Sequence, residues 1–176
     1  MRLVLRLVFA VLSSAAASTH AQSPAVSDQV LKAVLLYKLP LFVYEAAGDK
    51  RAPISICTLG DAPLGNALDR MPATLADGRR IDLKTISGNA DTGDCGFVFV
   101  GRSESGRLDS LLRRFGNRRM VTVSDIDGFA EAGGMVEFSL RADGSGVLIL
   151  INRKAAQKQG IEFNAQLLRL ARIVEP

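Results

Sequence analysis

The sequence predicts a three-layer α/β fold, in which a mostly parallel central sheet carries a C-terminal antiparallel hairpin and has helices on both faces. Strand-like and helix-like segments alternate over the first two-thirds of the chain, which is the pattern of parallel βαβ units. A continuous apolar run between Gly96 and Gly101 is typical of a central parallel strand. The segments 135–141 and 147–151 flank Asp143-Gly144, which favours a hairpin turn, so the sheet is expected to be mixed.

The first 21 residues have the pattern of a cleaved signal peptide. Arg2 and Arg6 precede a short apolar run, and residues 13–18 are all Ser or Ala. Small residues at positions −3 and −1 predict cleavage after Ala21. A membrane anchor is the alternative, but the apolar run is shorter than the roughly 20 residues that span a bilayer. We therefore expect residues 22–176 to form one exported domain that resides in the periplasm.

Removal of that segment limits the available chemistry. It contains the only histidine, His20, and two of the 22 Lys and Arg residues, which leaves 20 against 18 Asp and Glu and a net charge of +2. Without histidine, a Ser-His-Asp or Cys-His mechanism and an imidazole metal site are excluded. We expect a protein that is not an enzyme.

Two cysteines remain, Cys57 and Cys95, 38 positions apart. In an oxidising compartment a pair of cysteines most simply forms a disulfide, and two buried free thiols are the alternative. The length of the closed loop predicts about 4 kcal/mol of stabilisation. The sequence does not tell whether such a disulfide is permanent or a redox switch.

The segment that starts at Ser27 or Asp28 predicts a helix to about Ala46. Its apolar residues, which include Tyr37 and Phe42, lie on nearly all sides, as in a helix that is buried on more than one side. One side is therefore a candidate interface with a second copy or a partner, and burial within the monomer is the alternative. Pro40 is expected to kink the helix or divide it.

The other elements are expected in alternation along the chain. A strand at 80–86 should turn Ile81 and Leu83 inward, and Asn152 should cap a short helix that stops at Gly160. The full expected order is a strand at 54–59, a helix from 61 to 71, strands at 80–86 and 96–101, a helix at 105–115, a strand at 119–123, the hairpin, the helix at 152–160 and a final helix at 164–174.

The segment 121–138 is the most distinctive part of the sequence. A β-branched strand runs into two capping residues, Ser124 and Asp125, and glycines then interrupt regular structure around one large apolar residue, Phe129. Such a segment is either a recognition surface at a strand end or a tight turn, and we favour the turn. The expected turn residues are Ser124, Gly128, Gly133 and Gly134, and the candidate partner-binding residues are Phe129, Ile126, Asp125, Tyr37 and Phe42.

Two other loops have weaker signals. The segment 60–65 lies where a nucleotide-binding loop would lie, but it lacks the G-x-G-x-x-G spacing and carries Asp61, so a capped turn is the better interpretation. Asp125, Asp127 and Glu131 do not have EF-hand spacing. No metal and no cofactor are expected.

A basic segment runs from Arg102 to Arg119. It has six arginines that only two carboxylates interrupt, and a solvated helix face is the favoured interpretation over a surface for anionic headgroups or an acidic partner. We expect no nucleic-acid partner, because the protein is exported and the segment has no aromatic residue besides Phe115.

In order and spacing, several segments together resemble the YfiR-like family of exported bacterial proteins. These segments are 30–43, 54–61, 95–100, 121–135, 151–156 and 167–174. The most specific is Ser124-Asp-Ile-Asp-Gly-Phe129 with Gly133-Gly-Met135. The resemblance covers nearly all of the mature chain.

The resemblance implies a non-enzymatic α/β protein that forms homodimers. It would bind an inner-membrane diguanylate cyclase from the periplasmic side, hold it inactive and so lower cyclic-di-GMP signalling. An outer-membrane lipoprotein is a possible sequestering partner, and family members often carry a cysteine pair where Cys57 and Cys95 stand. The rival hypothesis is a periplasmic module that binds a small molecule at the strand ends, near Ser124 and Gly60.

Overall fold

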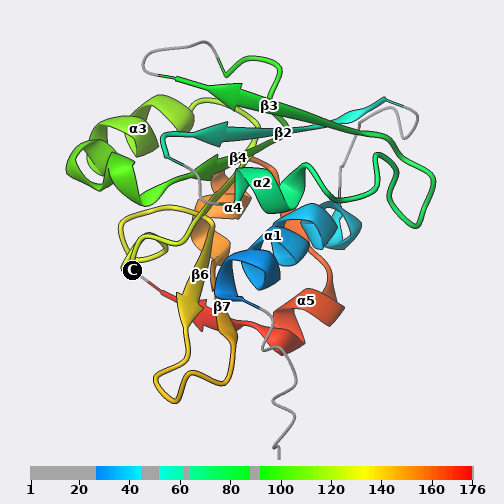
Figure 1. Cartoon of the computed structure of the whole chain (residues 1–176). Coiled ribbons are helices and arrows are strands. Elements are labelled where there is room, and N and C mark those ends of the chain that lie inside the picture. The colour runs from blue at the N-terminus through cyan, green and yellow to red at the C-terminus, as the bar shows by residue number, and fades with distance from the viewer. Residues whose placement is uncertain (1–26, 45–51, 62–63, 88–91, 176) are drawn as a thin grey trace, which may run out of the picture.

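A computed structural model describes residues 27–44, 52–61, 64–87 and 92–175 of the chain (Figure 1). The described part contains a seven-stranded mixed sheet in the order β3-β2-β4-β5-β6-β7-β9, helices on both of its faces and a separate two-stranded sheet. The predicted fold class is confirmed. The strands of the large sheet are β2 (Ile54–Leu59), β3 (Ile81–Ile86), β4 (Phe97–Val100), β5 (Val121–Ser124), β6 (Val136–Leu140), β7 (Val147–Asn152) and β9 (Arg172–Val174).

Helices and short strands complete the described part. The α-helices are α1 (Asp28–Lys38), α2 (Gly65–Leu68), α3 (Leu108–Phe115), α4 (Arg153–Lys158) and α5 (Ala165–Leu170). Two 3₁₀ helices are η1 (Leu39–Phe42) and η2 (Arg102–Arg107), and β1 (Val43–Tyr44) pairs with β8 (Glu162–Phe163) in the small sheet.

The first five strands of the large sheet are parallel. In chain order they are arranged 2-1-3-4-5, with β2 paired to both β3 and β4. In such sheets the strand order reverses between the first and third strands, and the loops at the carboxyl ends form the surface that usually carries a site. Here these loops begin at Gly60, Gly101 and Asp125.

The last two strands of the large sheet, β7 and β9, run opposite to the first five. β7 pairs antiparallel with β6, with Phe138 opposite Ile149, and β9 then pairs parallel with β7. The mixed sheet that the Asp143-Gly144 turn predicts is therefore confirmed, and Gly144 has a positive φ of 68° in that turn.

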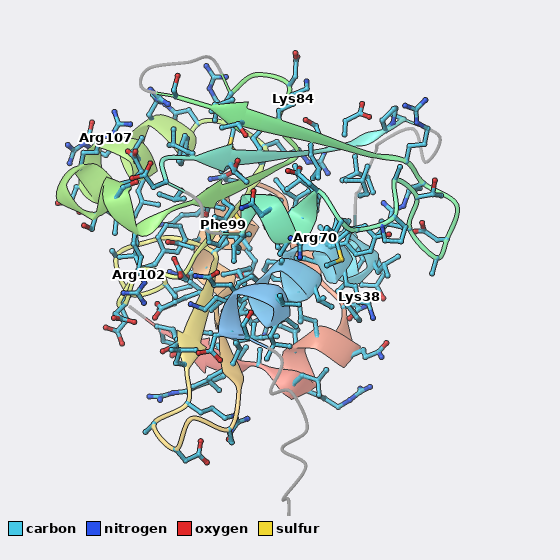
Figure 2. All side chains as sticks on the ribbon, viewed as in Figure 1. Lys38, Arg70, Lys84, Phe99, Arg102 and Arg107 are labelled. Atoms are coloured by element: carbon cyan, nitrogen blue, oxygen red, sulfur yellow. A yellow bond between two sulfur atoms is a disulfide. The ribbon has the colours of Figure 1, made fainter. Side chains whose placement is uncertain are left out.

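Each face of the sheet has its own hydrophobic core. On one face, strand residues such as Phe99 and Phe138 pack against α1, α2, α4 and α5. On the other face, Val98 and Leu59 pack against Phe115 of α3 and against the loop that follows β5. Figure 2 shows Phe99 inside the molecule and Arg102 and Arg107 at its surface.

The first helix is shorter than the sequence predicts. It ends at Lys38, and Pro40 lies in the first turn of η1, after which the chain becomes extended as β1. Proline has no N–H and clashes with the preceding turn, so the helix is divided near Pro40 as predicted. The predicted continuation to Ala46 is wrong for residues 43 and 44, which form β1. Residues 45 and 46 lie outside the described residues.

The final helix is also shorter than expected. α5 ends at Leu170, and the next residues form β9 on the edge of the sheet. The predicted helix to Val174 is wrong, because Ile173 and Val174 are β-branched and gain a hydrogen-bonded partner in β7. Leu83 on the edge strand β3 was expected to point into the core but is 38% exposed, since β3 has a neighbour on one side only.

Candidate regulatory site

The loop between β5 and β6, residues 125–135, starts at a strand end that is fixed by Ser124. Its side chain is fully buried, and its Oγ donates to the carbonyl of Val100 at 2.7 Å and accepts from the N–H of Ile126 at 3.0 Å. The hydroxyl thus joins the ends of β4 and β5. It also sets the direction in which the 125–135 loop leaves the sheet.

Buried polar side chains from the sheet hold the rest of this loop. Glu137 of β6 is 3% exposed, and its carboxylate accepts from the N–H groups of Gly128 at 3.2 Å and Ala130 at 3.0 Å. Asn152 donates to the carbonyl of Ala130 at 2.8 Å, and Thr122 accepts from the N–H of Met135 at 3.0 Å. The 125–135 loop is therefore a preorganised part of the fold.

The sequence analysis did not predict that Glu137 and Asn152 hold the 125–135 loop. Asn152 caps α4 as expected, since its Oδ1 accepts from the N–H of Ala155 at 2.9 Å, but the same side chain also holds the loop. A carboxylate in the apolar strand Val-Glu-Phe was the available signal for Glu137, because a buried carboxylate needs hydrogen-bond donors.

Phe129 is a core residue. Its ring is fully buried among the side chains of the α3 face, and the backbone of Gly134 lies directly on it, so that a Cβ at position 134 would overlap the ring. Gly128 and Gly133 have φ values of 78° and 109°, which favour glycine, as expected of turn residues. The local backbone thus accounts for the residue type at Ser124, Gly128 and Gly133. At Gly134 the residue type is accounted for by packing against the Phe129 ring.

The burial corrects the predicted contact surface of this loop. Phe129 is 0% exposed, Ile126 8% and Asp125 3%, so a direct contact through these three side chains is excluded in this conformation. The physical reason is that one large apolar residue in a polar loop gains more by packing under the loop than by facing water. The exposed residues of the loop are Asp127, Glu131, Ala132 and Gly133.

Asp125 forms a buried ion pair with Lys32 of α1. The Nζ to Oδ2 distance is 2.8 Å, and the side chains are 7% and 4% exposed. The Nε of Arg102 lies 3.5 Å from the same oxygen, and its Nη2 lies 3.3 Å from Asp127. The hydrogen bond to Asp127 raises the pKa of Arg102 above its ordinary value; desolvation opposes this, and the charge of Asp125 adds to it. The sequence indicated no such role for Lys32.

The two candidate residues at the end of the first helix differ in exposure. Tyr37 is 7% exposed and its hydroxyl donates to the carbonyl of Thr74 at 2.8 Å, so it ties α1 to the segment before β3 and offers little surface. Phe42 is half-buried at the edge of the core. Leu31 and Val34 on α1 are also half-exposed, and Leu140 of the hairpin is 46% exposed.

Cys57 and Cys95 form a disulfide with a Cα–Cα distance of 5.8 Å. Both residues are buried in the core on the α3 face, together with Phe129 and Phe115. The disulfide therefore belongs to the same hydrophobic core as the buried ring of the 125–135 loop. This confirms the pairing expected from the cysteine count.

The strand-end crevice expected to hold a small molecule is filled by the chain itself. A Cβ on Gly60 would lie 2.5 Å from Ser103 Oγ and 2.7 Å from the Glu104 side chain, and Ser124 spends its hydroxyl within the sheet. Within the described ranges, no group of three or more His, Cys, Asp or Glu side chains is placed to hold a metal ion. None of the helices described is long and apolar enough to span a membrane.

The fold and this loop define a mixed α/β domain that is fastened by a disulfide and presents a rigid strand-end loop. The chain belongs to the YfiR/HmsC-like family, whose model matches residues 29–172. Members of this family are periplasmic regulators of diguanylate cyclase signalling and are not enzymes.

Two solved structures are similar in fold. A conserved domain protein from Vibrio cholerae O1 biovar El Tor has a TM-score of 0.59 at 15% identity over 83% of this chain. The ABC domain in complex with L-Trp from Streptococcus pneumonia has a TM-score of 0.57 at 12% identity over 84% of it. In both cases the matched part is 60% of the other chain, so the likeness concerns the fold alone. No curated protein matches the sequence.

Proposed function

We propose that this protein is a periplasmic regulator that binds and inhibits an inner-membrane diguanylate cyclase and so lowers cyclic-di-GMP. The observation that carries the proposal is the family match over residues 29–172. The N-terminal export pattern supports a periplasmic location, and so does the buried disulfide, because disulfides persist in oxidising compartments.

The regulator acts through contact. It shifts its partner toward the inactive state only to the extent that it binds that state more tightly than the active one. A rigid surface suits this role, because little conformational entropy is lost when it binds. In the 125–135 loop the exposed carboxylates Asp127 and Glu131 replace the buried Phe129 as the proposed contact groups.

A second surface serves self-association. We assign the homodimer contact to the half-exposed apolar residues of α1 and η1, with Phe42, Leu31 and Val34 at its centre and Leu140 beside them. An outer-membrane lipoprotein that binds either surface would compete with the cyclase or with the dimer. This would relieve the inhibition.

Co-expression with a membrane-bound diguanylate cyclase of the same organism tests the proposal. Cyclic-di-GMP, measured in cell extracts by mass spectrometry, should fall on expression of the wild-type protein. Glu131→Lys should weaken the effect, whereas Asp69→Lys, an equal charge change at an exposed position after α2, should not. Unchanged cyclic-di-GMP with folded protein present in the periplasm overturns the proposal.

A further inference from the structure

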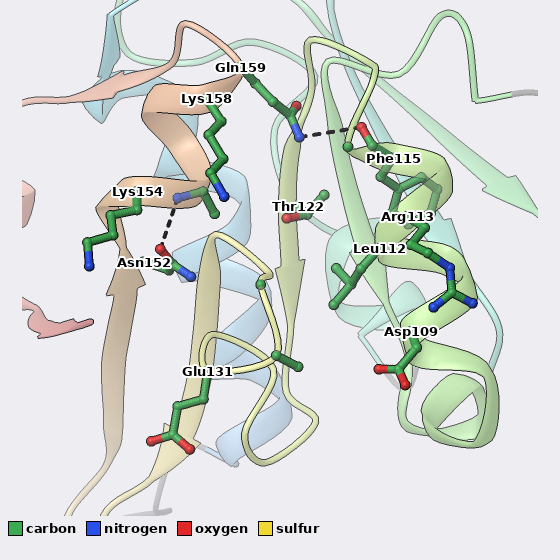
Figure 3. Close-up of a pocket in the computed structure, with 14 residues that line it drawn as sticks. Asp109, Leu112, Arg113, Phe115, Thr122, Glu131, Asn152, Lys154, Lys158 and Gln159 are labelled. Atoms are coloured by element: carbon green, nitrogen blue, oxygen red, sulfur yellow. Dashed lines mark hydrogen bonds between the residues drawn. The ribbon is translucent and has the colours of Figure 1, made fainter. Parts of the chain in front are cut away.

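A cleft of about 550 Å³ lies between α3, residues 131–133 of the loop and α4 (Figure 3). Its volume is within the range of small-molecule sites, roughly 300–1,000 Å³. It is separate from the filled crevice at Gly60, and it shares only Glu131, at its rim, with the proposed cyclase contact. Its lining comes from three segments far apart in the chain, and the side chains of the sheet that fix the loop also form its floor.

The floor of the cleft is rich in hydrogen-bond donors. Thr122 is 2% exposed, and its Oγ1 accepts from the N–H of Met135, which leaves its own proton free to donate. Asn152 is 1% exposed and uses Oδ1 for Ala155 and one amide hydrogen for Ala130, so its second amide hydrogen remains. Both residues line the cleft.

Cations line the sides of the cleft. Lys154 and Lys158 are one turn apart on α4, and Arg113 lies on α3, where its guanidinium extends toward Asp109 in Figure 3. None of the three forms an ion pair with another residue of the described part. In Figure 3 Lys158 extends from α4 toward the gap between the two helices, whereas Glu131 points away from it. Lys158 is therefore the cation that extends into the cleft.

The net charge of the cleft favours a ligand with a single negative charge. Asp109 also lines the cleft, whereas Lys154 and Glu131 both point away from the gap in Figure 3, so Lys158, Arg113 and Asp109 leave one net positive charge. A monoanion matches this balance, whereas a dianion such as a phosphate monoester would leave one negative charge without a partner. Leu112 of α3, which is half-buried, and the neighbouring Phe115 provide an apolar wall.

We propose that this cleft binds a small organic monocarboxylate. Its carboxylate accepts hydrogen bonds from Thr122 and Asn152 and pairs with Lys158, and its apolar body lies against Leu112. Charge-assisted hydrogen bonds orient the carboxylate, and removal of the apolar body from water contributes the remaining affinity. Gln159, which follows α4, also lines the cleft, and its side-chain amide lies 3.4 Å from the carbonyl of Phe115 at the end of α3.

Benzoate is a suitable probe, and two molecules of nearly the same shape are its controls: benzyl alcohol, which is neutral, and benzylammonium, which is a cation. In ¹H–¹⁵N NMR titrations of the mature protein, benzoate should cause saturable shifts at Leu112, Thr122, Asn152 and Lys158. Benzyl alcohol and benzylammonium should bind at least about fivefold more weakly, as should benzoate to the Lys158→Gln variant.

Arg153→Gln is the matched control, because it removes one positive charge from the same helix at a residue that does not line the cleft. It should leave the affinity for benzoate unchanged. Thr122→Val, which removes the hydroxyl, should also lower the affinity; because that hydroxyl accepts from the N–H of Met135, the amide shifts of the free variant must first show that the 125–135 loop is held as in the wild type. The proposal is overturned if benzyl alcohol binds as tightly as benzoate, if Lys158→Gln binds benzoate as the wild type does, or if the shifts map elsewhere.

Discussion

At the scale of single residues, Gly134 and Phe129 determine how the 125–135 loop is built. Gly134 does not have a positive φ, so its need for glycine comes from the Phe129 ring beneath it and from nothing in its own backbone. The backbone at position 134 can lie this close to the Phe129 ring only because it carries no side chain. Phe129 is therefore sealed in the core by a neighbour that lacks a Cβ.

We expect Gly134→Ala to destabilise the protein by about 1–3 kcal/mol, because the added methyl group overlaps the Phe129 ring and the loop must move outward. Urea unfolding followed by circular dichroism measures the loss. Gly106→Ala is the control: its φ is not positive and a Cβ there meets no atom within 4 Å, so the stability should change little or rise slightly. Equal stabilities of the two variants would contradict the packing described for Phe129.

The turn formed by this loop was predictable from the sequence, but the exposure of its side chains was not. The polar residues and glycines around Phe129 indicate a turn, and they are equally compatible with a ring that faces solvent or the core. The decision depends on Glu137 and Asn152, which lie 8 and 23 positions further along the chain and reach the loop only after the strands have paired. A single sequence does not contain that information in a local pattern.

At the scale of elements, local signals predicted the starts of α1, α4 and α5 better than the ends of α1 and α5, whereas α2 (Gly65–Leu68) is shorter than the helix expected from 61 to 71. Ser27, Asn152 and Asn164 each accept a hydrogen bond from the first turn of a helix, and each could be recognised as a cap. The ends of α1 and α5 depend instead on tertiary partners. The chain leaves α1 to pair β1 with β8 and leaves α5 to pair β9 with β7, and these pairings override the helical pattern.

The Lys32–Asp125 pair joins α1 to the loop, and we expect it to be strongly coupled. Lys32→Met alone should cost about 3–5 kcal/mol, because the buried carboxylate of Asp125 would lose its main partner. The cost should be nearer the lower figure, because Arg102 also faces Asp125. The double variant Lys32→Met with Asp125→Leu should recover most of that loss. A double-mutant cycle in urea measures the coupling directly.

The control for this cycle is an exposed pair on the same protein. Lys84 and Asp94 are 3.9 Å apart, with side chains that are 46% and 92% exposed, so Lys84→Met should change the stability by no more than about 0.5 kcal/mol. A similarly small effect of Lys32→Met would show that the α1–loop connection carries little free energy. In that case the loop would be held by the hydrogen bonds of Ser124, Thr122, Glu137 and Asn152.

At the scale of the whole molecule, the disulfide closes one complete βαβ unit. The 38-residue separation between Cys57 and Cys95 contains α2 and the edge strand β3. That strand pairs with β2 only, so its other edge has no hydrogen-bonded strand in the described part. The covalent link compensates for this, because it restricts the conformations that residues 57–95, which include β3, can adopt in the unfolded chain.

The double variant Cys57→Ala with Cys95→Ala should therefore lose about 4 kcal/mol of stability by loop-closure entropy. The loss of two buried side chains from the core beside Phe129 adds a smaller amount. Urea unfolding of the oxidised wild type, the wild type in reductant and the variant separates these contributions, because reduction removes only the link. Amide hydrogen exchange should locate the change: protection should fall most in β3, whereas β5 and β6, which lie outside the closed loop, should lose protection only with global stability. Equal losses in β3 and β5 would mean that the disulfide stabilises the molecule as a single unit and has no particular role at its open edge.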